Sequence, residues 1–238
     1  MVFVMDMPPD GVRLEKGEFD YENNVASSSI YIRMEFLRKV YGLLSMQLTL
    51  TTIVAATFAY TPVLRDTIYS NPWLLVLNII LSFGLFIALH INRYKFPINL
   101  FLLIGFTIVE AITIGVFISV YDAEVIVKAF ALTLIITTSL TIYAFQTKRD
   151  FTKMGAGLLI GLETVIGLEL MNIFLGSNGL ELALAGGSAL MFCLFTVFDT
   201  QMMMKKLSPE EYILATINLY LDVLNLFLEL LRLLGDRK

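Results

Sequence analysis

Seven long apolar stretches dominate this sequence. They cover residues 38–60, 73–92, 98–120, 125–146, 155–175, 180–204 and 209–234. Each is about 20 residues or longer, the length that an α-helix needs to cross the hydrocarbon core of a bilayer. The connections are short, and prolines fall in the N-terminal tail, in connections or at the start of the last stretch. The sequence therefore predicts an all-α polytopic membrane protein with seven transmembrane helices, whose neighbours along the chain pack antiparallel.

The composition supports this class and excludes others. The chain is 57% hydrophobic and 16% charged, whereas a soluble domain carries about 25% charged residues. The net charge is only −4 and the basic residues are scattered, so we expect the lipid bilayer and no nucleic acid as a partner. Residues 1–30 are predicted to form a disordered cytosolic tail, and residues 31–238 a single seven-helix domain. Without a P-loop, zincin or hydrolase motif, we expect no enzyme and no resident cofactor.

The distribution of Lys and Arg predicts the orientation in the membrane. Ten basic residues lie before or at the start of the first stretch or in the even-numbered connections: Arg33, Arg38, Lys39, Arg93, Lys95, Lys148, Arg149, Lys153, Lys205 and Lys206. The odd-numbered connections hold two, Arg65 and Lys128. Because cytosolic loops carry the excess of positive charge, we expect a cytosolic N-terminus. Seven spans would place Arg237 and Lys238 on the opposite side, against this rule, whereas a re-entrant last helix would return them to the cytosol.

The last apolar stretch has clear signals at both ends. Ser208 and Glu211 have the spacing of a capping box, and Pro209 occupies the first helical position, where its missing N–H costs nothing. Gly235 is suited to end a helix in a left-handed conformation. These signals predict one helix from Ser208 to Gly235.

A polar stripe runs along this otherwise apolar helix. Its members are spaced i, i+4, i+7 and i+11, and therefore share one face: Asn218, Asp222, Asn225 and Glu229. Such a stripe needs a polar surface to face inside the bundle. For Asn218 and Asn225, interhelical hydrogen bonding and ligation of an ion are equally open. Glu229 lies near the helix end, where it is expected to reach the membrane interface.

Several carboxylates lie within the predicted spans, although each costs about 2.5–3.5 kcal/mol at the centre of a membrane helix. They are Glu110, Glu163, Glu169, Asp199, Asp222 and Glu229. The nearest basic candidate for neutralising them is Arg93, at the edge of the second span. The carboxylates must therefore be solvated in a cavity, protonated or bound to a cation. Glu163 and Glu169 are six residues apart and cannot share one helix face.

Asp199 and Asp222 form the most informative pair. The connection between the sixth and seventh spans is very short, so the two helices are antiparallel neighbours. For straight helices the two residues would differ in depth by about 10 Å, a gap that closes if the first turn of the seventh helix protrudes. Two facing carboxylates in a medium of low dielectric constant would share a proton. Such a pair could sense pH and ligate Ca²⁺, which prefers oxygen ligands.

Four segments resemble the transmembrane Bax-inhibitor-motif (Lifeguard) family, and within it the Golgi anti-apoptotic branch. They are IRMEFLRKVYGLLSMQLTLT, KRDFTKMGAGL, VFDTQ and KLSPEEYILATINLYLDVLNLFLELLR. The resemblance implies a last helix wrapped by the other six and a pH-sensitive Ca²⁺ leak, with Asp199 and Asp222 as the sensor pair. Some members hold the second aspartate with an arginine; the matching position here is Asn92, followed by Arg93.

Three functional hypotheses follow. The first is a Ca²⁺ leak channel of Golgi membranes, with the endoplasmic reticulum as the alternative site, that lowers stored Ca²⁺ and inhibits apoptosis. Its expected residues are Asp199 and Asp222, with Asn218, Asn225, Glu110 and Arg93 as auxiliaries, and Ca²⁺ is its permeant ion. The second is a non-conducting regulator that binds Ca²⁺-release channels or Bcl-2-type proteins. The third, an intramembrane aspartic protease, lacks the expected Gly-x-Gly-Asp motif. We expect a monomer or weak oligomer.

Overall fold

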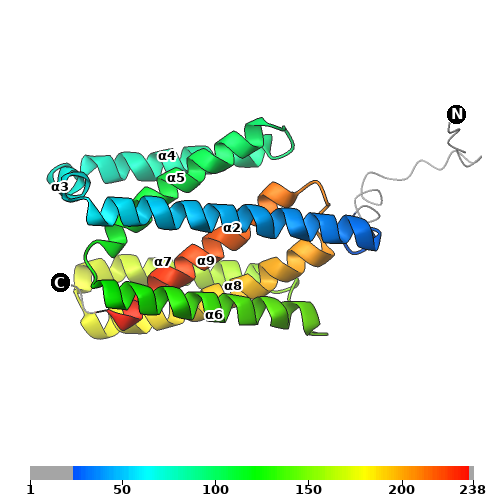
Figure 1. The fold of residues 1–238 in the computed structure, drawn as a ribbon. Helices are drawn as coiled ribbons and strands as arrows, with labels where there is room; N and C mark the ends of the chain where they lie inside the picture. The colour runs from blue at the N-terminus through cyan, green and yellow to red at the C-terminus, as the bar shows by residue number, and fades with distance from the viewer. Residues whose placement is uncertain (1–23, 236–238) are drawn as a thin grey trace, which may run out of the picture.

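The computed structural model describes residues 24–235, and this part of the chain is built from helices (Figure 1). They are α2 (Ile30–Tyr60), α3 (Pro62–Ser70), α4 (Trp73–Asn92), α5 (Ile98–Ile118), α6 (Ala123–Gln146), α7 (Gly155–Leu175), α8 (Asn178–Lys205) and α9 (Tyr212–Leu234). All but the short α3 are long and apolar enough to cross a membrane. The predicted all-α fold with seven membrane helices is confirmed.

Helix α9 lies at the centre of the bundle. It packs against α8, α6, α2 and α5, and in Figure 1 it passes between α2 and α6. More than half of the residues in its most apolar 18-residue stretch are buried, which is the largest share among the seven membrane helices. Its buried side chains include Ile213, Tyr220 and Leu226. Wrapping of α9 by all six other helices stays a prediction.

The outer helices form antiparallel pairs around this centre. Helix α4 packs on α5, and α7 packs on α8, as the short connections predict. Helices α4 and α7 bury little of their apolar surface inside the chain, which fits helices that face lipid. Pro62 begins α3 at a helix N-terminus, where a missing N–H is tolerated.

The start of α9 differs from the prediction. The helix begins at Tyr212, and residues 208–211 form a turn closed by a 2.9 Å bond from Glu211 N–H to the Ser208 carbonyl oxygen. Half of the predicted capping box is present, because Glu211 Oε2 accepts from Ser208 N–H at 3.1 Å. The Ser208 hydroxyl instead accepts from Glu210 N–H. Glu211 is also held by Tyr94, whose hydroxyl donates to it at 2.8 Å, so its side chain serves the contact with the α4–α5 turn.

The predicted left-handed end at Gly235 is wrong. Gly235 has φ −113° and ψ 126°, which is extended backbone. The glycine is needed for close packing instead, because a Cβ there would lie 2.5 Å from Cδ1 of Tyr121.

The packed chain begins before α2. Val25 is buried and its N–H donates to the Leu207 carbonyl oxygen at 2.9 Å, so the end of the expected tail contacts the α8–α9 connection. Residues 1–23 of that tail and the basic residues Arg237 and Lys238 lie outside the described residues.

Candidate functional site

The structure brings Asp199 of α8 and Asp222 of α9 together. Their carboxyl groups interact directly, and Asp222 is only 5% exposed. The late start of α9 explains this meeting. Counted from Lys205 and Tyr212, the two residues differ in depth by about 6 Å rather than 10 Å. The two residues meet as a protruding first turn of the last helix would allow, and the role of the pair in sensing or ion passage stays a prediction.

The surroundings of the pair leave its negative charge uncompensated. Oδ2 of Asp222 is buried and has no hydrogen-bond donor among residues 24–235. Asn218 Nδ2 donates to Asp199 Oδ1 at 3.3 Å, and no Lys or Arg of the described chain forms an ion pair with either aspartate. A buried carboxylate without a cation or donor is costly. The pair can lower this cost by sharing a proton or by binding a cation.

The auxiliary candidates divide into one that joins the pair and three with other contacts. Asn218 joins it through the bond to Asp199. Asn225 uses its amide nitrogen on the Leu221 carbonyl oxygen of its own helix at 2.8 Å. Glu110 accepts a short hydrogen bond from Ser82 of α4, so it links two outer helices.

Arg93 also has partners away from the aspartates. Its Nη1 lies 3.1 Å from His90 Nε2, and its Nη2 lies 3.5 Å from Glu211 Oε1. The arginine therefore connects the α4–α5 turn to the start of α9, and in this structure it does not contact Asp222.

Two more buried side-chain hydrogen bonds lie close to the central helix, and the sequence analysis did not predict them. The Thr51 hydroxyl and the Tyr220 hydroxyl are 2.7 Å apart, and Gln47 Nε2 donates to Thr107 Oγ1 at 2.9 Å. Gln47 and Thr51 are four residues apart, so they share the inward face of α2. That spacing of two polar residues in an apolar helix is the signal that could have found them.

The glutamine of the VFDTQ segment has a structural role. Gln201 is fully buried; its Nε2 donates to the Arg149 carbonyl oxygen at 2.9 Å, and its Oε1 accepts from Phe151 N–H at 2.8 Å. The amide of Gln201, two residues after Asp199, thus binds two backbone groups of the α6–α7 connection.

The remaining carboxylates gather around an arginine that sequence reasoning overlooked. Arg232 forms ion pairs with Glu169 at 2.8 Å and Glu229 at 2.9 Å. The Glu229 side chain therefore has an ionic partner on its own helix, while its position relative to the membrane interface stays a prediction. Glu163 is exposed on another face of α7, as its spacing from Glu169 predicts. The i, i+3 spacing of Glu229 and Arg232 was the missed signal.

No group of three or more His, Cys, Asp or Glu side chains within residues 24–235 is arranged to hold a metal ion. A Ca²⁺ site on the aspartate pair would have to take further ligands from amides, backbone carbonyls or water. It stays a prediction.

Known proteins resemble this chain over nearly its whole length. The family described as "Inhibitor of apoptosis-promoting Bax1" matches residues 33–238. The Golgi anti-apoptotic protein of Vaccinia virus (strain Lister) is 47% identical over 91% of this chain and 92% of its own length. Protein lifeguard 4 of Mus musculus is 44% identical over 91% of each chain. Bax inhibitor 1 of Schizosaccharomyces pombe is 36% identical over 92% of this chain and 82% of its own. Together with the seven membrane helices, these matches establish that the chain belongs to the Bax-inhibitor (Lifeguard) family.

Proposed function

We propose that this protein inhibits apoptosis from the Golgi membrane by letting Ca²⁺ leak through the bundle, with the Asp199–Asp222 pair as its pH-sensitive control. The names of two relatives support the biological part, since they describe a Golgi anti-apoptotic protein and a lifeguard protein. The aspartate pair between α8 and the central helix α9, with Asp222 buried, carries the mechanistic part.

The pair acts through its charge. When both carboxylates are deprotonated, their repulsion favours separation of α8 and α9, and their oxygens attract a hard cation. When the pair holds a proton, one carboxyl group donates to the other and the attraction for cations falls. Asn218 orients Asp199 in either state through its 3.3 Å bond. The leak is therefore expected to be larger at higher pH.

Ca²⁺ flux into liposomes containing a Ca²⁺-sensitive dye tests this function. Asp199→Asn and Asp222→Asn keep the side-chain shape but remove the charge, and we expect each to reduce the flux at neutral pH by about tenfold or more, equivalent to at least ~1.4 kcal/mol. Asp66→Asn is the matched control, because Asp66 is an exposed aspartate on α3. Wild-type flux in both variants would overturn the proposed role of the pair.

A second candidate function is regulation by binding without conduction. Gly186 and Gly187 of α8 favour it, because a Cβ at either position would meet no atom of the chain within 4 Å. This small-residue surface would let a helix of a Ca²⁺-release channel or a Bcl-2-type protein approach closely. Purified protein that carries no flux at any pH, while the same protein protects cells from apoptosis, would favour this function over the leak.

A further inference from the structure

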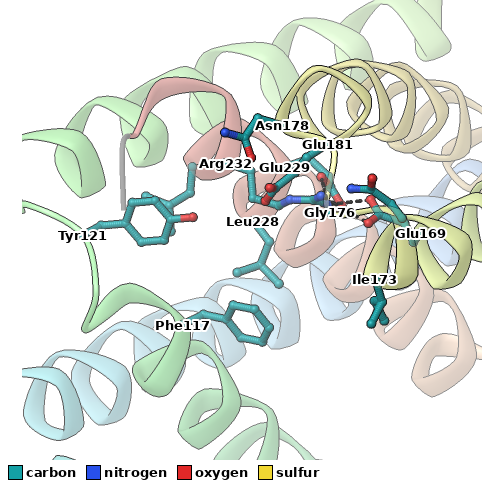
Figure 2. A pocket seen from close by; sticks show the side chains of 12 residues that line it. Phe117, Tyr121, Glu169, Ile173, Gly176, Asn178, Glu181, Leu228, Glu229 and Arg232 are labelled. Atoms are coloured by element: carbon teal, nitrogen blue, oxygen red, sulfur yellow. Dashed lines mark hydrogen bonds and ion pairs between the residues drawn. The ribbon is translucent and has the colours of Figure 1, made fainter. Parts of the chain in front are cut away.

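A cavity of about 500 Å³ opens at the C-terminal end of α9, far from the aspartate pair along the helix. Its charged wall consists of Glu169 from α7, Glu181 from α8, and Glu229 and Arg232 from α9. Phe117 and Tyr121 lie on the opposite side, and Figure 2 shows the arginine reaching across towards Glu169. By the predicted orientation, this is the non-cytosolic end of the bundle.

Arg232 is held tightly within this wall. Its Nη1 and Nη2 donate to the two carboxylate oxygens of Glu169 at 2.8 and 3.3 Å, and Nη1 also donates to Glu229 Oε2 at 2.9 Å. Glu181 adds further electrostatic attraction. The Arg232 side chain is 18% exposed, so solvent screens these bonds only in part. Bidentate hydrogen bonds between arginine and a carboxylate are among the stronger polar contacts in proteins.

The Glu169–Arg232 contact matters because α7 is otherwise weakly attached to the centre. Helix α7 packs mainly on α8 and buries little of its surface. Among residues 24–235, Glu169–Arg232 is the polar side-chain contact that joins α7 to α9. Releasing it would leave the end of α7 to move away from α9 by sliding on α8.

We propose that Arg232 is a latch that closes the non-cytosolic end of the bundle by bridging Glu169 on α7 and Glu229 on α9. This inference rests on the proposed leak and adds a gate to it. The guanidinium occupies the acidic wall that a passing cation would have to cross. In the latched state its positive charge repels the cation; in the released state α7 separates from α9, and the carboxylates face an open, hydrated mouth.

Accessibility at Leu231 tests the latch without relying on flux. Leu231 lines the cavity and is 1% exposed, and Cys193 is the only cysteine of the chain. In a Cys193→Ala background, we expect a hydrophilic thiol reagent to label Leu231→Cys slowly. Adding Glu169→Gln or Arg232→Gln should raise the labelling rate about tenfold, equivalent to ~1.4 kcal/mol. The exchange Glu169→Arg with Arg232→Glu should return the rate towards its starting value. Glu163→Gln, on an exposed face of the same helix, is the matched control.

A distance measurement provides a second readout if Leu231→Cys does not fold. Spin labels at Phe174→Cys on α7 and Val127→Cys on α6 lie at exposed positions. We expect their separation to increase in Glu169→Gln but not in Glu163→Gln. Unchanged labelling and unchanged distance in Glu169→Gln would overturn the latch even if the protein conducts Ca²⁺. Changes in both, in a protein that carries no flux, would keep the latch and overturn the proposed leak.

Discussion

At the scale of single residues, buried amides carry much of the structural specificity around the candidate site. Gln201 contacts the α6–α7 connection with both ends of its amide, while Asn218 contacts Asp199. The two residues flank the aspartate pair from α8 and α9. These contacts hold the helix segments on which the two aspartates lie.

Gln201→Leu should destabilise the protein by about 1–3 kcal/mol, because it leaves the Arg149 carbonyl oxygen and the Phe151 N–H without their bonds. Thermal unfolding of detergent-solubilised protein measures the change. Gln146→Leu, at the exposed end of α6, is the control and should unfold near the wild-type temperature. Equal unfolding temperatures for the two variants would contradict the role of Gln201.

Asp150 allows a pH prediction outside the membrane. The Thr152 hydroxyl and backbone N–H both donate to its Oδ1, at 2.8 and 3.2 Å, and these bonds lower the pKa of Asp150 below the ordinary 3.8. Because the folded pKa is the lower one, the stabilising contribution is fully present above pH 3.8 and is lost as the pH falls through the folded value.

Thr152→Val removes the hydroxyl donor and should move the pKa of Asp150 up towards its ordinary value. Carbon-13 NMR titration of the Asp150 carboxyl group gives the measurement, and Thr152→Ser, which keeps the hydroxyl, should titrate like wild type. An unchanged pKa in Thr152→Val would show that the hydroxyl is not the main cause.

At the scale of helices, sequence reasoning found the seven spans because each is a long apolar run, but it misplaced their ends. Helix α2 begins at Ile30 rather than at residue 38. The sequence did not predict this earlier start, because the first turns carry charged residues and lack the apolar character of a membrane span. Helix α9 begins late because Glu211 is held by Arg93 and Tyr94. Contacts between residues distant in sequence decide such ends, and a single sequence does not reveal them.

The same limit applies to the sites formed between helices. The meeting of Asp199 and Asp222 follows from one short connection, which spacing can describe. The contact between Glu169 and Arg232 joins helices separated by the whole of α8. Local periodicity cannot predict which face of α7 turns towards α9, so this pair required the structure.

Close packing of α2 on α5 gives a prediction at this scale. A Cβ at Gly115 would lie 2.8 Å from Phe58 Cβ and 3.1 Å from the Ala55 carbonyl oxygen. Backbone cannot move aside cheaply, so Gly115→Ala should destabilise the protein by about 1–3 kcal/mol. Gly84→Ala meets no atom within 4 Å and should be neutral or stabilising by up to ~1 kcal/mol. Thermal unfolding distinguishes them; equal stability would contradict tight packing at Gly115.

At the scale of the whole molecule, α9 joins three polar regions along one central helix. Glu211 contacts the α4–α5 turn at one end, the aspartate pair lies in the interior, and Arg232 joins α7 at the other end. Asp222 and Arg232 are ten residues apart, or about 15 Å along the helix axis. A shift of α9 would therefore disturb the interior pair and the latch together, which gives the proposed leak two coupled points of control.

The pH dependence of Ca²⁺ flux in liposomes tests the central claim most directly. Wild-type protein should carry more Ca²⁺ as the pH rises from acidic to neutral, because the Asp199–Asp222 pair loses its shared proton and attracts the cation. Asp222→Asn should carry little Ca²⁺ and show no such rise, while the Asp66→Asn control should follow wild type. A pH profile in Asp222→Asn that matches wild type would contradict control of the leak by the aspartate pair.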